Sequence, residues 1–139
     1  MGNFFYSMLF IFSGFIVVKS LHALFQHPGI KQQMMSLNHL FVLLLVYINI
    51  ILGFGLMYCS LLFMNYHVLS EKGFMLEGGL IKMMEGAMYF SAVTMLSVGY
   101  GDITPLGVGR WISITEALIG YLLPAAFVIT SVIDHRKMK

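Results

Sequence analysis

The sequence is poor in charged residues and in cysteine. Asp, Glu, Lys and Arg make up only 10 % of the 139 residues, whereas a soluble domain carries about 25 %. Since hydrophobic residues reach 59 %, the composition excludes an ordinary water-soluble domain and predicts a protein of the lipid bilayer. The net charge of +2 is too small to indicate nucleic-acid binding, and the single Cys59 excludes an internal disulfide framework.

Residue types that bind metals are present, but not in the pattern of a metal site. The five histidines lack ligand spacing, and an interfacial position explains each of them better. The twelve methionines are scattered through apolar runs, which favours lipid contact over metal handling. We expect neither enzyme activity nor an organic cofactor.

Three apolar segments are long enough to cross a bilayer, at residues 3–25, 37–64 and 107–133. A signal peptide is the alternative for the first, but no basic residue precedes it and no small-residue cleavage site follows it. A shorter apolar stretch, residues 84–96, cannot cross the membrane and is typical of a re-entrant segment. Residues 65–83, which precede it, are mixed and polar.

Basic residues predict the orientation of the chain. Lys19 and Lys31 flank the first connection, and further basic residues follow the last apolar segment. Three spans put these two regions on one side of the membrane, which the positive-inside rule makes cytoplasmic. We therefore expect a plasma-membrane protein whose N-terminus lies outside and whose C-terminus lies in the cytoplasm.

Residues 94–102, TMLSVGYGD, place irregular backbone between two apolar segments. Such backbone is tolerated at membrane depth only where it faces protein or water. Gly99 and Gly101 alternate with other residues, and glycine adopts positive φ at little cost, so successive carbonyls can face one axis. Carbonyl oxygens suit a dehydrated monovalent cation, and several chains must surround the axis. The expected ligands are the carbonyls of Ser97, Val98, Gly99 and Tyr100.

The longer run YFSAVTMLSVGYGDITP resembles the pore loop of the tetrameric potassium channels, whose signature is Thr-Val-Gly-Tyr-Gly followed by Asp. The resemblance covers residues 84 to about 124 and includes the order of span, pore helix, filter and span. It implies an all-α membrane protein with three transmembrane helices, a re-entrant pore helix and a selectivity-filter loop. It also implies a C4 homotetramer that conducts K⁺ passively, with no regulatory partner indicated.

The resemblance divides the chain into an additional N-terminal transmembrane helix, residues 1–29, and a pore domain, residues 30–139. The pore domain is expected to contain an outer helix at 37–64, an extracellular turret at 65–83, a pore helix at 84–96, a filter at 97–101 and an inner helix at 107–133. We expect no voltage sensor, because no segment repeats arginine at every third position. We also expect no cytoplasmic ligand-binding domain, because only six residues follow the inner helix.

Most of the signature matches residue by residue. The matching residues are Val98, Gly99, Tyr100, Gly101 and Asp102. Ser97 replaces the usual threonine, so the hydroxyl is kept and a methyl group is lost. Thr94 stands where the family has the threonine that braces the filter tyrosine, and Tyr89 and Phe90 stand where a Trp-Trp pair is frequent. Tyr89 keeps a donor for Asp102, whereas Phe90 keeps only bulk, which implies a less braced filter.

The last span contains candidate gating residues. Gly120 matches the hinge glycine of the family's inner helix, and Pro124 removes the hydrogen bond to the Gly120 carbonyl. We predict a bend there, with a static kink as the alternative. Val128 and Val132 share one helix face and line the inner mouth, or else contact lipid or a neighbouring helix.

Glu116 places a carboxyl group inside the last span, where an ionisable side chain indicates a function. We expect it to support the filter from behind, by bonding the pore-helix backbone or the region of Ser97. A position near the cavity, where it would concentrate cations, is the alternative.

Three other functions stay open. A non-selective monovalent cation channel would follow if Ser97 and the altered aromatic pair relax the filter. Tyr100 favours K⁺ selectivity, because related non-selective channels carry Asp there. A K⁺ transporter subunit is the second alternative, although such proteins carry four pore repeats in one chain. A non-conducting membrane interaction protein is the third, and it leaves the Gly-Tyr-Gly run unexplained.

Overall fold

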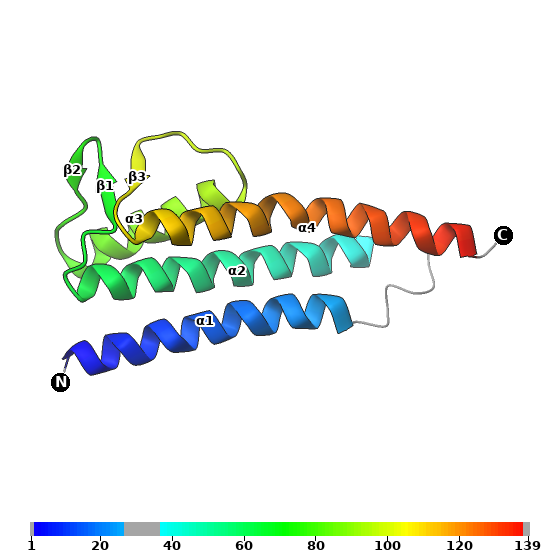
Figure 1. Ribbon diagram of the computed structural model, residues 1–139, viewed down its shortest axis with the longest axis horizontal. Helices are drawn as coiled ribbons and strands as arrows, with labels where there is room; N and C mark the ends of the chain where they lie inside the picture. The colour runs from blue at the N-terminus through cyan, green and yellow to red at the C-terminus, as the bar shows by residue number, and fades with distance from the viewer. Residues whose placement is uncertain (1, 27–36, 138–139) are drawn as a thin grey trace.

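A computed structural model describes residues 2–26 and 37–137, with the side chains of residues 4–22 and 40–126. The described residues form four helices and three short strands (Figure 1). The helices are α1 (Gly2–Gln26), α2 (Leu37–Phe63), α3 (Leu80–Met95) and α4 (Gly109–Lys137). The strands are β1 (Leu69–Glu71), β2 (Phe74–Met75) and β3 (Ile103–Pro105). The fold is thus mostly helical, and the expectation of an all-α fold is corrected by one small sheet.

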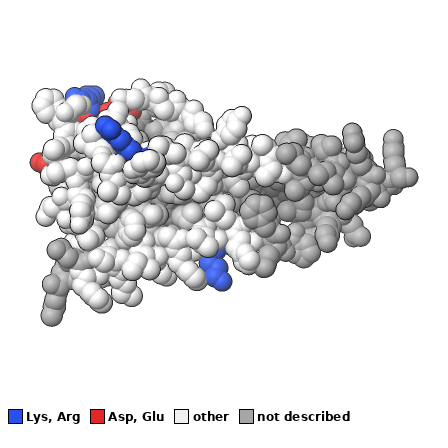
Figure 2. All heavy atoms as spheres, viewed as in Figure 1, with Lys and Arg blue, Asp and Glu red and all other residues white. Residues whose placement is uncertain are grey.

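The long helices α1, α2 and α4 run side by side, and the shorter α3 lies at the end that carries the sheet (Figure 1). Within the described residues, two helices are long and apolar enough to cross a membrane, at Phe4–His22 and Leu40–Phe63. In the view of Figure 2, most charged side chains lie at the sheet end, and the flanks of the helices are almost free of charge. This distribution is the one expected when the flanks contact lipid.

Two glycines allow α2 to contact a different helix on each side. A side chain at Gly53 would collide with Val17 of α1, and one at Gly55 would collide with Met88 of α3. Small residues at such positions let helices approach closely where lipid removes the hydrophobic drive for association. The buried core lies mainly between α2, α3 and the start of α4, and includes Ile50, Phe54, Tyr58, Ala87, Phe90 and Met95.

Two of the three strands, β1 and β2, lie within residues 65–83, which the sequence predicts to be a turret. The strand order of the sheet is β2-β1-β3, and β1 pairs antiparallel with both neighbours. Lys72 and Gly73 adopt positive φ values of 50° and 86° in the turn between β1 and β2. The hydroxyl groups of Ser70 and Thr104 lie 2.8 Å apart across the β1–β3 pair. The sheet therefore ties residues 69–75 to the segment that follows the signature.

Three predicted boundaries need correction. The pore helix, expected at 84–96, begins at Leu80 because Gly79 is an extended N-cap residue, and it ends at Met95. It therefore takes the last residues of the predicted 65–83 turret. The inner helix, expected at 107–133, runs from Gly109 to Lys137, because residues 107 and 108 form a turn.

Candidate functional site

The loop after α3 has an alternating backbone. Ser97, Gly99 and Gly101 have φ values of 55°, 55° and 79°, so every second residue lies in the left-handed region. Glycine adopts this region freely, but a serine there is strained. The alternation expected for the two glycines is present and extends to Ser97. It is the backbone pattern that successive carbonyls need in order to face one side of an extended chain.

The N–H groups of the loop are held by the end of α3. The amides of Val98 and Gly99 donate to the carbonyl of Val93 over 2.9 and 3.3 Å, and the amide of Ser97 donates to the carbonyl of Thr94 over 3.0 Å. These bonds occupy backbone donors and leave the loop carbonyls available. Side chains of the loop are open in the single chain, and Tyr100 is 72 % exposed.

Asp102 fixes the other end of the loop. The Tyr89 hydroxyl donates to Asp102 Oδ2 over 2.8 Å, and the Lys72 amide donates to the Asp102 carbonyl over 2.9 Å. The contact expected between Tyr89 and Asp102 is thus present. The hydrogen bond to this carboxylate raises the pKa of the Tyr89 phenol, which keeps it a donor. Asp102 Oδ1 is buried without a hydrogen-bond partner among the described residues.

Phe90 lies away from the loop, in the core. Its side chain is 4 % exposed, and its ring meets that of Tyr58 edge to face, with 5.2 Å between the ring centroids. A bracing role of Phe90 at the filter stays a prediction. Adjacent residues of a helix point in directions about 100° apart, so only one of them can face Asp102.

Glu116 joins three helices through a buried carboxyl group that is 0 % exposed. The Tyr58 hydroxyl of α2 donates to Glu116 Oε2 over 2.9 Å, and the Ser91 hydroxyl of α3 bonds to Glu116 Oε1. The Ser91 hydroxyl also lies 2.9 Å from the Ile51 carbonyl of α2. Glu116 faces α3 as expected, but it bonds side chains there and not the backbone or the region of Ser97.

Comparison with known proteins identifies the family. A family described as "Ion channel" matches residues 43–134, from within α2 to near the end of α4. The chain belongs to this ion channel family. The matched segment contains the loop, Asp102 and Glu116, whereas α1 precedes it. With its two apolar helices, the protein is therefore a membrane protein with an ion channel domain, and the family suggests a non-enzyme.

Two similar proteins carry the name "Protein LctB". The protein from Geobacillus stearothermophilus is 44 % identical over 100 residues, which cover 72 % of this chain and 75 % of the relative. The protein from Bacillus caldotenax is 42 % identical over 104 residues, which cover 73 % of this chain and 78 % of the relative. No solved structure matches the chain.

The α4 helix of this channel domain passes close to the end of α3. A side chain at Gly120 would collide with the backbone carbonyl of Met95, so glycine is required for this approach. Pro124 lies inside α4, and the helix continues through both residues. The predicted bend stays a prediction. Val128 and Val132 fall outside the residues whose side chains are described.

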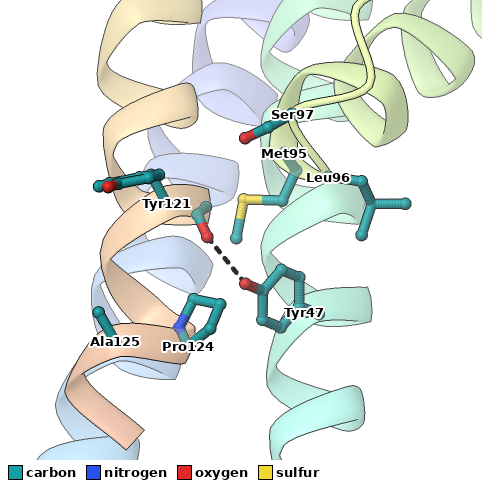
Figure 3. Close-up of a pocket in the computed structure, with 8 residues that line it drawn as sticks. Tyr47, Met95, Leu96, Ser97, Tyr121, Pro124 and Ala125 are labelled. Carbon is teal, nitrogen blue, oxygen red and sulfur yellow. Dashed lines mark hydrogen bonds between the residues drawn. The ribbon is translucent and has the colours of Figure 1, made fainter. Parts of the chain in front are cut away.

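A cavity of about 430 Å³ lies below the loop, between α2, α4 and the end of α3 (Figure 3). Ser97 borders its upper end, and Tyr47 and Pro124 border its lower part. Sequence reasoning missed Tyr47, Tyr58 and Ser91 as parts of the site. The available signal was a hydroxyl group within an apolar run, since a buried tyrosine hydroxyl usually finds a partner.

Proposed function

We propose that the protein is a K⁺-selective channel that conducts passively through the loop after α3. The observation that carries this proposal is the positive φ at every second residue from Ser97 to Gly101, in a chain of the ion channel family. Backbone carbonyls replace the hydration shell of the ion and release it again, because several weak sites share the path. The proposed ligands are the carbonyls of Ser97, Val98, Gly99 and Tyr100, and K⁺ is the permeant ion.

The proposed channel is a C4 homotetramer. One loop offers one wall, and its side chains are open to the surroundings in the single chain. Irregular backbone and an open loop are unfavourable in lipid, but four copies around an axis would place the loop against protein and water. The exposed apolar side chains of Leu96, Val98 and Tyr100 support this assembly, because neighbouring copies would cover them.

In this arrangement α3 is the re-entrant pore helix and α4 is the third transmembrane helix. The carbonyl end of a helix carries about half a negative charge, so α3 would stabilise a cation at the inner end of the loop. We assign residues 1–29 to an added span and residues 30–139 to the pore domain. The N-terminus and the sheet lie at one end of the molecule and the C-terminus at the other (Figure 1). This supports termini on opposite sides of the membrane, and we assign the N-terminus to the outside and the C-terminus to the cytoplasm of a plasma-membrane protein.

The filter is supported from two sides in this proposal. Tyr89 holds Asp102 at the outer end, and Thr94 receives the Ser97 amide at the inner end through its carbonyl. Glu116 acts further back by fixing α3 through Ser91. These contacts position the carbonyls without touching the ion.

Ion flux from purified protein in lipid vesicles tests the proposal. We expect K⁺ flux that exceeds Na⁺ flux and is blocked by Ba²⁺, and we expect Gly99→Ala to abolish it. Gly14→Ala is the matched control, because both glycines have open space around an added Cβ and only Gly99 has positive φ. A Gly99→Ala protein that conducts like the parent would contradict the carbonyl mechanism. Equal K⁺ and Na⁺ flux would instead favour a non-selective channel, for which the strained serine at position 97 is the reason.

A further inference from the structure

Pro124 leaves one backbone acceptor of α4 without its usual partner. In an α-helix the N–H of residue 124 would donate to the carbonyl of Gly120, but proline has no N–H. Pro124 lies well inside α4, which runs from Gly109 to Lys137. The Gly120 carbonyl therefore needs another donor, since an unpaired carbonyl is costly within a bilayer.

A tyrosine of another helix supplies the missing donor. The Tyr47 hydroxyl of α2 donates to the Gly120 carbonyl over 2.8 Å (Figure 3). The ring of Tyr47 is partly buried against the core, so the hydroxyl is delivered by a packed side chain. The bond joins the two helices at the one carbonyl that Pro124 releases.

The same residue of α4 also touches α3. The Cα of Gly120 lies so close to the Met95 carbonyl that no side chain fits between them. Three helices thus meet at Gly120, directly below the loop that begins at Leu96. A displacement of α4 at this point would change the support of the end of α3.

The surroundings of the Tyr47–Gly120 bond leave room for movement. The cavity of about 430 Å³ borders Tyr47, Gly120 and Pro124, so the bond lies at an open hollow, while Ile119 and Leu123 of α4 pack against the core nearby. Its volume is sufficient for several waters, since one water occupies about 30 Å³ in the liquid. Water can replace the phenol as the donor to a carbonyl at a modest free-energy difference. The Gly120 carbonyl therefore has two alternative donors, the Tyr47 hydroxyl and water in this cavity.

We propose that Tyr47 is a latch that holds the Gly120–Pro124 turn of α4 against α2, and that α4 moves below Gly120 only when this bond opens. In the latched state the Gly120 turn of α4 is fixed to α2 and to the end of α3. In the released state water from the cavity binds the carbonyl, and the lower half of α4 moves as a separate unit. The link to gating rests on the proposed channel function, whereas the latch itself does not.

A double-mutant cycle tests the latch on the full-length protein in lipid nanodiscs. Tyr47→Phe removes the donor, and Pro124→Ala restores the N–H that makes this donor unnecessary. Hydrogen–deuterium exchange is measured at the α4 amides that follow residue 124. One hydrogen bond corresponds to a factor of roughly two to ten, so we expect Tyr47→Phe to speed this exchange by that factor. In the Pro124→Ala background the same change is expected to have no effect.

Tyr121→Phe is the matched control. It removes a hydroxyl from the same cavity, but the Tyr121 ring points away from Tyr47 and the Gly120 carbonyl (Figure 3). We expect α4 exchange in this variant to equal that of the parent. An equal effect of Tyr47→Phe with and without Pro124 would overturn the latch, because the tyrosine would then act through packing alone.

Single-channel recording separates the latch from the channel proposal. If both hold, Tyr47→Phe shortens the dwell time of the latched state by roughly two- to tenfold and leaves the other dwell time unchanged. If Tyr47→Phe speeds exchange only when Pro124 is present, and no ion current is seen, the latch is supported and the channel is refuted. Ion current with unchanged exchange and unchanged dwell times would support the channel and refute the latch.

Discussion

Replacing Glu116 with alanine removes a carboxyl group that connects α2, α3 and α4. The change deletes the hydrogen bonds to Tyr58 and Ser91, and each such bond contributes about 1 kcal/mol. It also leaves the buried Tyr58 hydroxyl without its acceptor, which costs about 1–3 kcal/mol. Ser91 keeps a partner, because its hydroxyl reaches the Ile51 carbonyl. We therefore expect Glu116→Ala to destabilise the protein by about 3–5 kcal/mol.

Glutamine is the matched variant, because it tests whether hydrogen bonding or charge matters at this site. The Ser91 hydroxyl has one hydrogen and two acceptors in reach, Glu116 Oε1 and the Ile51 carbonyl. If the side chain at position 116 donates a hydrogen bond to the Ser91 oxygen, the Ser91 hydrogen can go to the Ile51 carbonyl. A glutamine amide group can donate in this way. Its oxygen still accepts from Tyr58. We expect Glu116→Gln to stay within about 1 kcal/mol of the parent.

Thermal unfolding in detergent measures the stability of both variants, and native gels follow the proposed tetramer. A loss of about 3 kcal/mol, the lower end of the range expected for alanine, corresponds to a fall of roughly 10 °C for a chain of this size. The K⁺ flux of the glutamine variant is expected to remain, because Glu116 is buried away from the cavity below the loop. If glutamine destabilised the protein as much as alanine, the site would require an ionised carboxylate, and the hydrogen-bond reasoning would be refuted.

Two further substitutions test the ends of the loop. Gly120→Ala is expected to destabilise by about 1–3 kcal/mol through collision with the Met95 carbonyl, although alanine favours an open helix position by about 1 kcal/mol. Gly14→Ala is expected to raise the stability in the same thermal assay, because no neighbouring atom lies within 4 Å of an added Cβ. Tyr89→Phe removes the bond to Asp102 and is expected to speed amide exchange in residues 97–102 and to shorten sustained K⁺ current. Unchanged exchange would show that the sheet alone fixes this end.

The long helices were predictable because length and hydropathy determine them. An apolar run of more than twenty residues specifies a helix in lipid whatever its neighbours are, and α1 and α2 have nearly the predicted bounds. The alternating sign of φ at residues 97–101 was predictable too, because glycine at every second position indicates a backbone with positive φ there.

The sheet and the hydrogen-bond partners of Glu116 were not predictable, whereas the contact between Tyr89 and Asp102 was. Strands of two or three residues are too short to show a period of two, and β1 forms because β3, more than thirty residues away, pairs with it. The partners of Glu116 depend on how α2 and α3 cross α4, which spacing within one helix does not reveal. Gly120 was identified as a hinge from the resemblance to the potassium channels, but its contact with Met95 needs the position of α3.

The spacing of residues along α4 explains where that helix is held. Glu116, Gly120 and Pro124 are separated by four residues each, so they follow one another along one face. Glu116 is hydrogen-bonded to α3, and Gly120 touches the end of α3 and accepts a hydrogen bond from α2. Pro124 borders the cavity and donates no backbone hydrogen bond to the preceding turn of α4. Along the described side chains of α4, the helix is therefore held at Gly120 by the Tyr47 hydroxyl and, about one turn further on, by Leu123, which is buried in the core.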